Sequence, residues 1–163
     1  MVLFVCTGNT CRSVMAEALM QRLWEYYGDS SELRIASAGL APIDGKASLY
    51  TRELLGQEGI SLDSHIPRRL TGSQVREAGI ILVMEEHHRR AVLELYPDAA
   101  GKIYLLKEFA GITGEPLGVK DPYGGSREIY SRTLEEIREA VKKVIDKLAG
   151  KGKLTLDEEA SEK

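Results

Sequence analysis

Residues 2–13 of this chain read VLFVCTGNTCRS, and the class of fold follows from the order of apolar and polar residues in this segment. Its first five residues, Val2–Cys6, form a continuous apolar run of the kind found in strands that are buried on both faces of a parallel sheet. A polar loop, Thr7–Arg12, follows, and Ser13 is expected to cap a helix whose apolar residues repeat at helical spacing up to Gly28. The stretch therefore predicts a strand, a loop and a helix, which together open a βαβ unit.

The same alternation continues along the chain. Three further segments are strand candidates, at residues 33–37, 79–84 and 102–106, and the second of them is the most apolar. Helical patterns lie at residues 48–57, 71–79, 86–96 and 126–148. Strands that alternate with helices imply an α/β domain of three layers, in which a four-stranded parallel sheet carries helices on both faces.

Length and charge narrow the class of protein. The 163 residues suit a single domain, which we place at residues 1–149, and the charged segment 150–163 is expected to be a disordered tail. The formal net charge of −3 argues against a nucleic-acid partner. No apolar run approaches the ~18 residues that a membrane span requires, and the first residues lack the pattern of a signal peptide. These features predict a cytoplasmic protein without a nucleic-acid or membrane partner.

The loop after the first expected strand carries both cysteines of the chain, Cys6 and Cys11. In open parallel sheets, ligands bind beyond the carboxyl ends of the strands, so this loop occupies the expected site. A loop that runs into a helix N-terminus directs several backbone N–H groups at one point, and the helix dipole adds positive potential there. Gly8 is expected to adopt backbone angles that a side chain would forbid. The loop is therefore suited to a tetrahedral oxyanion.

The spacing Cys-x5-Arg places two reactive side chains at the two ends of this oxyanion-binding loop. Arg12 offers a planar fork that binds two phosphate oxygens at once. The positive field favours the thiolate form of Cys6, and a thiolate beneath a phosphoryl group is a nucleophile for phosphoryl transfer. The alternative is an inert cysteine buried at the end of a strand, and the position of the motif between a strand and a helix argues against that alternative.

Phosphoryl transfer from a thiolate also needs an acid that protonates the leaving group. Residues 111–125 hold five glycines and two prolines and are expected to form a loop. The segment DPYGGS, residues 121–126, supplies the candidate acid Asp121, with Pro122 stiffening its placement and the glycines permitting movement of the flanks. The alternative is that this segment forms only a turn and a helix cap.

Together these residues resemble the low-molecular-weight protein tyrosine phosphatase family. VLFVCTGNTCRSVMAEAL is similar to the opening of that family, and DPYGGS is similar to its acid loop. The resemblance continues through residues 37–39 and 64–71 and spans residues 1–148. It implies the strand order 2-1-3-4, no metal and no other cofactor. It also implies phosphorylated protein substrates and inorganic phosphate as the product.

The resemblance assigns roles to individual residues. Cys6 corresponds to the nucleophile, Arg12 to the phosphate clamp, and Asp121 to the general acid that later acts as a base. Ser37 and His65, together with Asn9 and Ser13, correspond to the polar network that supports the phosphate loop. The residues expected to contact the substrate are Thr7, Gly8, Asn9, Thr10, Cys11, Ser13 and Tyr123.

The substrate class depends on Thr10. Tyrosine phosphatases of this family usually carry Ile or Leu there and surround the substrate ring with aromatic residues, whereas this chain offers Tyr123 alone. CTGNTCRS with DPYGGS is similar to the bacterial branch that dephosphorylates phosphoarginine in proteins. A hydroxyl at Thr10 and the carboxylate of Asp121 suit a polar guanidino group, which favours phosphoarginine. Phosphotyrosine is the alternative substrate, and Thr10 could also simply bond its own backbone.

Other functions are less well supported. Thiol-dependent arsenate reductases look similar at the first loop, but they need a redox cysteine pair well downstream, and no cysteine follows Cys11. An oxyanion-binding module without turnover would not need nucleophile, clamp and acid together. Residues 85–88, EEHH, are expected to form a solvated polar helix face rather than a metal site. Peroxide is expected to drive a reversible Cys6–Cys11 disulfide, which would make the enzyme redox-sensitive.

Overall fold

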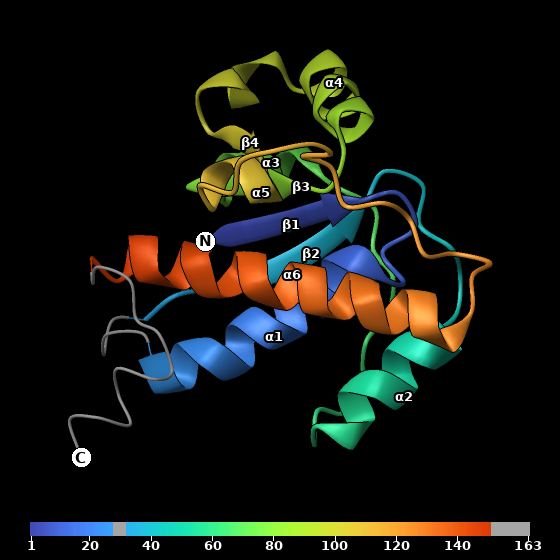
Figure 1. Ribbon diagram of the computed structural model, residues 1–163. Helices are drawn as coiled ribbons and strands as arrows, with labels where there is room; N and C mark the ends of the chain where they lie inside the picture. Colours follow the sequence, from blue (N-terminus) through green and yellow to red (C-terminus); the bar gives the residue numbers. More distant parts are fainter. Residues whose placement is uncertain (28–31, 151–163) are drawn as a thin grey trace.

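A computed structural model describes residues 1–27 and 32–150 of the chain (Figure 1). The strands are β1 (Val2–Cys6), β2 (Ile35–Gly39), β3 (Ile80–Val83) and β4 (Ile103–Leu105). The helices are α1 (Arg12–Tyr27), α2 (Leu49–Gln57), α3 (Gly72–Glu77), α4 (Glu86–Leu95), α5 (Leu106–Phe109) and α6 (Arg127–Leu148), with a 3₁₀ helix η1 (Pro97–Gly101). Gly28 and, beyond Gly150, the predicted tail lie outside the described residues.

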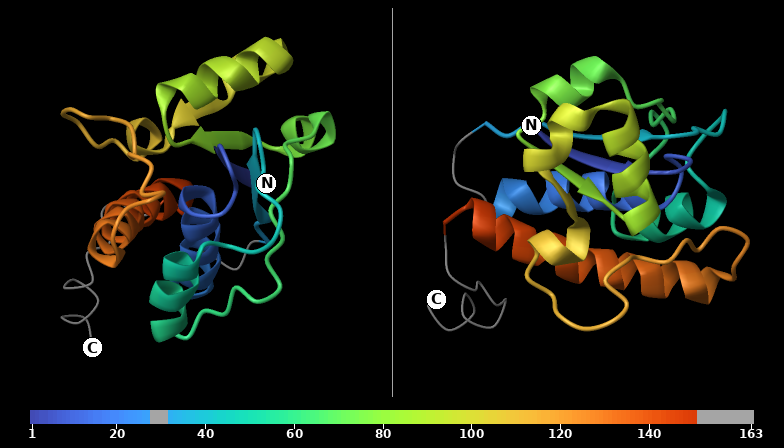
Figure 2. Two further views of the ribbon diagram at one scale, coloured as in Figure 1. Left: turned by 90° about the vertical axis from the view of Figure 1, so that its right-hand side faces the viewer. Right: turned by 90° about the horizontal axis from the view of Figure 1, so that it is seen from above.

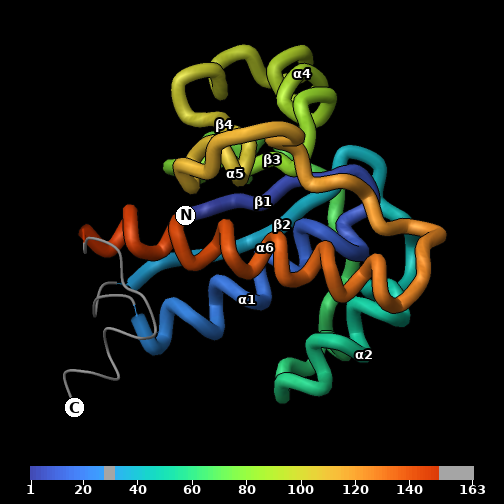
Figure 3. Tube along the Cα trace, viewed as in Figure 1, coloured from blue at the N-terminus to red at the C-terminus, as the bar shows by residue number. Residues whose placement is uncertain are grey.

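The four strands form one parallel sheet in the order β2-β1-β3-β4, which confirms the predicted order. The carboxyl ends of the strands therefore meet at one edge. Figure 3 shows that the loops after β1 and β2 and the segment before α6 gather at this edge. The sheet order thus brings together segments that lie far apart in the sequence.

Helices cover both faces of the sheet, as predicted, and Figure 2 shows the sheet between the two helix layers. Every residue of β1 is buried. On one face, Phe4 packs in a core to which α1, α2 and α6 contribute. On the other face, Leu3 and Val5 pack with Val75 of α3 and Val92 of α4. The alternating side chains of one strand therefore serve two separate cores, which is why its sequence is apolar throughout.

Strand β2 lies two residues later than expected, at Ile35–Gly39 instead of 33–37. Its position is set by the parallel register with β1, in which Val2 pairs with Ile35 and Cys6 pairs with Gly39. Residue preferences do not encode this register, because it depends on pairing with a strand about 30 residues away in the sequence.

Three local predictions were wrong or incomplete. Helix α1 begins at Arg12, so Ser13 is a helical residue rather than the cap. Pro97 ends α4 as expected but also begins the 3₁₀ helix η1, which was not predicted. Leu106, expected at the end of β4, is the first residue of the short helix α5 and is buried in the core beside α6. None of the helices in the described ranges has the length and apolar character needed to cross a bilayer.

Candidate active site

A cleft of about 190 Å³ opens at the carboxyl edge of the sheet, where β1 passes through its loop into α1. It brings together residues from three distant segments of the chain. Its lining residues are Cys6, Thr7, Gly8, Thr10, Cys11, Arg12, Ile43, Asp121 and Tyr123. The expected nucleophile, clamp and acid thus share one cleft, while Ile43 was not foreseen.

Asn9 supports the loop from beneath. It is fully buried and adopts a positive φ of 55°, which is uncommon for a residue with a side chain. Its Nδ2 donates to the hydroxyls of Ser13 and Ser37, both at 2.9 Å. Its Oδ1 accepts from the backbone N–H of Arg68 at 3.0 Å, and its carbonyl accepts from His65 Nε2 at 2.9 Å. These bonds offset the cost of about 1–3 kcal/mol that such a backbone conformation carries.

The expectation for Gly8 was wrong, because the left-handed residue of the loop is Asn9. At Gly8 the constraint is space: a Cβ there would lie 3.1 Å from Cδ1 of Ile43. Gly39 at the end of β2 is more tightly enclosed, since its Cβ would lie 2.6 Å from the carbonyl oxygen of Thr7. The loop therefore packs directly against β2, and a side chain at Gly39 would displace it.

A chain of side-chain hydrogen bonds leads from Cys6 into the protein. Cys6 Sγ lies 2.9 Å from Ser13 Oγ. Because Ser13 Oγ accepts from Asn9, its own proton is available to the sulfur. On the far side, Ser37 donates to Glu17 Oε2 at 2.9 Å. Burial raises the pKa of Glu17, opposed by this hydrogen bond and by nearby positive charges. Sequence reasoning did not foresee the contact between Glu17 and Ser37.

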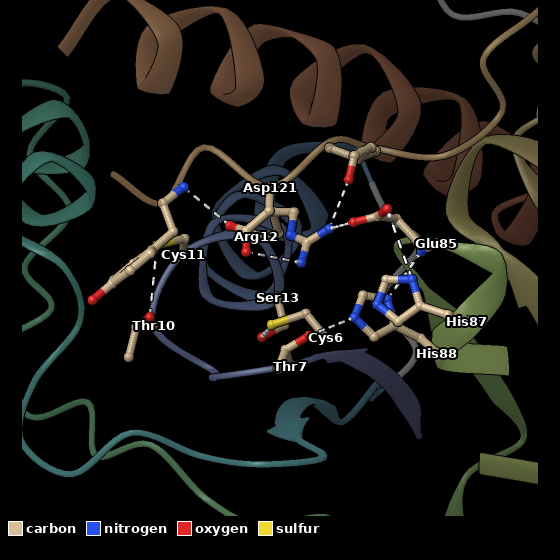
Figure 4. A network of polar contacts seen from close by, with 12 residues as sticks. Cys6, Thr7, Thr10, Cys11, Arg12, Ser13, Glu85, His87, His88 and Asp121 are labelled. Carbon is tan, nitrogen blue, oxygen red and sulfur yellow. Dashed lines mark hydrogen bonds and ion pairs between the residues drawn. The ribbon is translucent and has the colours of Figure 1, made fainter. Parts of the chain in front are cut away.

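Arg12 is buried and held by several oxygens (Figure 4). Its Nη1 donates to the carboxylate of Glu85 and, at 2.8 Å, to the carbonyl of Val119. Its Nη2 lies 3.6 Å from Asp121 Oδ2. Glu85 and Val119 therefore fix the direction of the guanidinium, while the Asp121 carboxylate faces it across the cleft.

His88 departs from the environment that the sequence predicts for it. The prediction of a solvated polar face fails here, because His88 is fully buried and its Nε2 lies 2.9 Å from Thr7 Oγ1. Its Nδ1 accepts from the backbone N–H of Glu85 at 3.0 Å. Burial, together with the charge of Arg12 and the neighbouring His87, lowers the pKa of His88 to about 3. A signal was present in the sequence: EEHH directly follows an apolar strand, so it begins at the carboxyl edge where the site lies.

Asp121 sits in a tight turn at the mouth of the cleft. Its side chain is about half exposed, and its Oδ1 accepts from the backbone N–H of Tyr123 at 3.1 Å. Gly124 has a φ of 78°, and a Cβ on Gly125 would lie 2.8 Å from the carbonyl of Pro122, so both glycines are needed for the turn. The segment is therefore a turn and also places a carboxylate beside Arg12, so the two alternatives are compatible.

Cys11 belongs to a second polar cluster beneath the loop. Its Sγ donates to Ser48 Oγ at 3.2 Å and lies 3.5 Å from Tyr130 Oη and 3.6 Å from Thr10 Oγ1. Burial raises the pKa of Tyr130 to about 12, and the Cys11 contact adds to that effect. Ser48 and Tyr130 were not foreseen, because neither carries a motif and both reach the loop through the packing of α2 and α6.

Comparisons with known proteins agree with this geometry. The model of the family described as low molecular weight phosphotyrosine protein phosphatase matches residues 1–154. The chain is 35% identical over 147 residues to a protein-arginine-phosphatase of Bacillus subtilis (strain 168), covering 90% of this chain and 95% of that protein.

Two solved structures are similar over 90% of this chain. One is a mutant of the YwlE arginine phosphatase with a phosphorylated active-site serine, with a TM-score of 0.82, 34% identity and 94% of its own chain covered. The other is a low molecular weight protein tyrosine phosphatase from T. tengcongensis, with a TM-score of 0.80, 40% identity and 97% covered. Fold, site and comparisons agree, and the chain belongs to the low molecular weight phosphotyrosine protein phosphatase family.

Proposed function

We propose that this member of the family is a cysteine-dependent protein phosphatase that hydrolyses phosphoarginine in proteins through a phosphocysteine intermediate. The observation that carries the substrate class is Thr10, a hydroxyl side chain on the wall of the cleft that also holds Cys6 and Asp121. The relative from Bacillus subtilis, which is named a protein-arginine-phosphatase, supports this proposal.

The proposed reaction has two steps. In the first, the Cys6 thiolate attacks phosphorus, the S–P bond forms, and the bond between phosphorus and the guanidino nitrogen breaks as Asp121 delivers a proton to that nitrogen. Arg12 and the loop N–H groups stabilise the negative charge on the phosphoryl oxygens. In the second, Asp121 takes a proton from water, which attacks phosphorus and releases inorganic phosphate and the free thiolate. The reaction needs no metal or other cofactor.

Polar groups around the leaving group support phosphoarginine as substrate. The guanidino group is planar and carries N–H donors, so it needs acceptors. Asp121 is about half exposed at the mouth, and Thr10, whose side chain carries a hydroxyl, lines the cleft. A site that pairs with such donors rejects an analogue that leaves the site's own polar groups unpaired.

One observation favours phosphotyrosine as a second candidate substrate. Ile43 and Tyr123 both line the cleft, and both are exposed, at 48% and 70%. Together they offer apolar surface to an aromatic ring, although the loop that carries Ile43 has no aromatic residue. Steady-state kinetics with phosphoarginine and phosphotyrosine peptides, side by side, test the choice. We expect the higher kcat/KM for phosphoarginine, and the reverse order would establish the tyrosine alternative.

Asp121→Asn is expected to lose more activity on substrates with poor leaving groups. Asparagine keeps the shape of the side chain but cannot deliver the proton that such a leaving group requires. With an activated aryl phosphate, whose leaving group departs with little protonation, the loss should be smaller by roughly 10-fold or more. The measurement is kcat/KM across a series of aryl phosphates of rising leaving-group pKa. An equal loss across the series would remove Asp121 from the role of acid.

The two cysteines carry a proposal about redox regulation. We expect peroxide to form a Cys6–Cys11 disulfide that inactivates the enzyme reversibly and protects Cys6 from further oxidation. Cys11 Sγ is engaged with Ser48 and Tyr130, so it must leave these partners for the bond to form. Activity is measured after peroxide and then thiol reduction, relative to each protein's untreated activity. Cys11→Ser should recover much less than the wild type, and equal recovery would exclude a protective role.

Three further points complete the proposal. A single domain at residues 1–149 is supported by α6, which ends at Leu148 and packs with α1 in a shared core. Its partners are proteins that carry phosphoarginine. A nucleophilic thiol must stay reduced to act, and the cytoplasm maintains thiols in that state, which supports a cytoplasmic location.

A further inference from the structure

His88 and Thr7 form a buried hydrogen bond that the reaction above does not use. His88 Nδ1 accepts from the backbone N–H of Glu85, so this nitrogen carries no proton. The ring is neutral at neutral pH, since its pKa is lowered to about 3. The single ring proton therefore sits on Nε2 and is donated to Thr7 Oγ1 at 2.9 Å.

The direction of this hydrogen bond decides what Thr7 offers to the cleft. Because its oxygen already accepts from His88, its own O–H proton is free to turn elsewhere. Among the described residues, the Thr7 hydroxyl makes no other side-chain hydrogen bond. Thr7 is exposed and lines the same cleft as Cys6 and Arg12, and Figure 4 shows it between Cys6 and His88. Within the described part of the chain, the proton of this hydroxyl has no acceptor, and it lies at the cleft.

We propose that Thr7 binds the phosphoryl group of the substrate by donating its hydroxyl proton to a phosphoryl oxygen, and that His88 is the positioning residue that sets this direction. A phosphoryl dianion offers only acceptors, so a hydroxyl beside it must donate. If the ring proton were on Nδ1 instead, the Thr7 hydroxyl would donate to Nε2 of His88. The lone pairs of the Thr7 oxygen would then face the phosphoryl dianion and repel it. A hydroxyl polarised by a donor behind it is also a stronger donor.

Glu85 links this pair to the clamp. Its backbone N–H selects the tautomer of His88, while its carboxylate holds Nη1 of Arg12. One residue at the start of α4 therefore orients two donors for the same anion. The inference rests on the proposed phosphoryl site but not on the choice between arginine and tyrosine, because both substrates carry the same phosphoryl group.

The test compares two substitutions at Thr7 in the full chain. Thr7→Val keeps the shape and removes the hydroxyl, whereas Thr7→Ser keeps the hydroxyl. We expect Thr7→Val to raise the inhibition constant of inorganic phosphate by about tenfold or more, the range for a hydrogen bond to an anion. Thr7→Ser should stay within about threefold of the wild type. Thr113→Val, the same substitution in a distant loop, is the matched control and should leave phosphate inhibition unchanged.

Substrates separate phosphoryl binding from recognition of the leaving group. Thr7→Val should lower kcat/KM for phosphoarginine and phosphotyrosine peptides by the same factor. A loss confined to one substrate, or phosphate inhibition equal to the wild type, overturns the inference. If the wild type hydrolysed neither substrate, the proposed function would fail. The inference about Thr7 could still be tested by thermal shift, which compares phosphate binding to Thr7→Val and Thr7→Ser.

Variants of His88 test the positioning role independently of the stability of Thr7→Val. His88→Gln can place an amide N–H near the position of Nε2, whereas His88→Asn is too short to reach Thr7. We expect His88→Asn to weaken phosphate inhibition and His88→Gln to restore most of it. Equal phosphate inhibition in the two variants, with only their melting temperatures changed, would show that His88 supports the fold alone and would refute its role.

Discussion

Cys6→Ser is expected to abolish turnover, with a fall in kcat of at least ~10³-fold on phosphoarginine and aryl phosphate substrates alike. The serine hydroxyl is not ionised at neutral pH, and the side chain that contacts Cys6 Sγ is the hydroxyl of Ser13, at 2.9 Å, which is not a base. The residue is 3% exposed, but the substitution only exchanges sulfur for the smaller oxygen, so the fold should persist. Steady-state kinetics measure the loss.

Binding must be separated from chemistry in this experiment. The Cys6→Ser protein keeps Arg12 and the loop N–H groups, so inorganic phosphate should still raise its melting temperature. Cys11→Ser is the matched control, because it makes the same substitution five residues away in the same loop, and it should retain turnover within roughly tenfold of the wild type. Turnover retained in Cys6→Ser would falsify the nucleophilic role.

Thr10→Ile is expected to shift substrate preference from phosphoarginine towards phosphotyrosine by roughly 30-fold or more in the ratio of kcat/KM values. The larger side chain adds about one to two methylene-sized groups of apolar surface, which contributes on the order of 1 kcal/mol to an aromatic ring. It also removes a hydroxyl from the path of the guanidino group, and an N–H left unpaired costs a further ~1–3 kcal/mol. Thr10 is 8% exposed and lines the cleft, so both effects act inside the site.

Two other substitutions at Thr10 separate these effects. Thr10→Val keeps the volume and removes the hydroxyl, so it should lower kcat/KM for phosphoarginine with little gain for phosphotyrosine. Thr10→Ser keeps the hydroxyl and should preserve the wild-type preference. The measurement is kcat/KM for both peptides with each variant. If Thr10→Ile changes both substrates alike, Thr10 does not select the substrate.

Local patterns in the sequence determined the layers and the centre of the site. The apolar run Val2–Cys6 is buried on both faces of the sheet, and its residues alternate between two cores. A capping box of Thr71 and Gln74 starts α3, where the helical pattern from residue 71 was expected. The motif Cys-x5-Arg could also be interpreted from local sequence. A short loop between a strand and a helix holds its first and last residues, Cys6 and Arg12, close together at the helix N-terminus, where an anion binds.

The contacts of the loop with the turn after β3 depend on the tertiary structure. Glu85 reaches Arg12 and His88 reaches Thr7 because the sheet order places β3 beside β1, so the turn after β3 opens at the loop after β1. The chain separates Arg12 from Glu85 by 73 residues, and no local pattern reports a contact across that distance. The sequence EEHH alone predicts a solvated helix face; Glu86 and His87 are indeed exposed, but strand pairing places Glu85 against Arg12 and buries His88 against Thr7. Secondary-structure propensity depends on a few neighbouring residues. The polar partners of a side chain at this site depend instead on which strands are adjacent in the sheet.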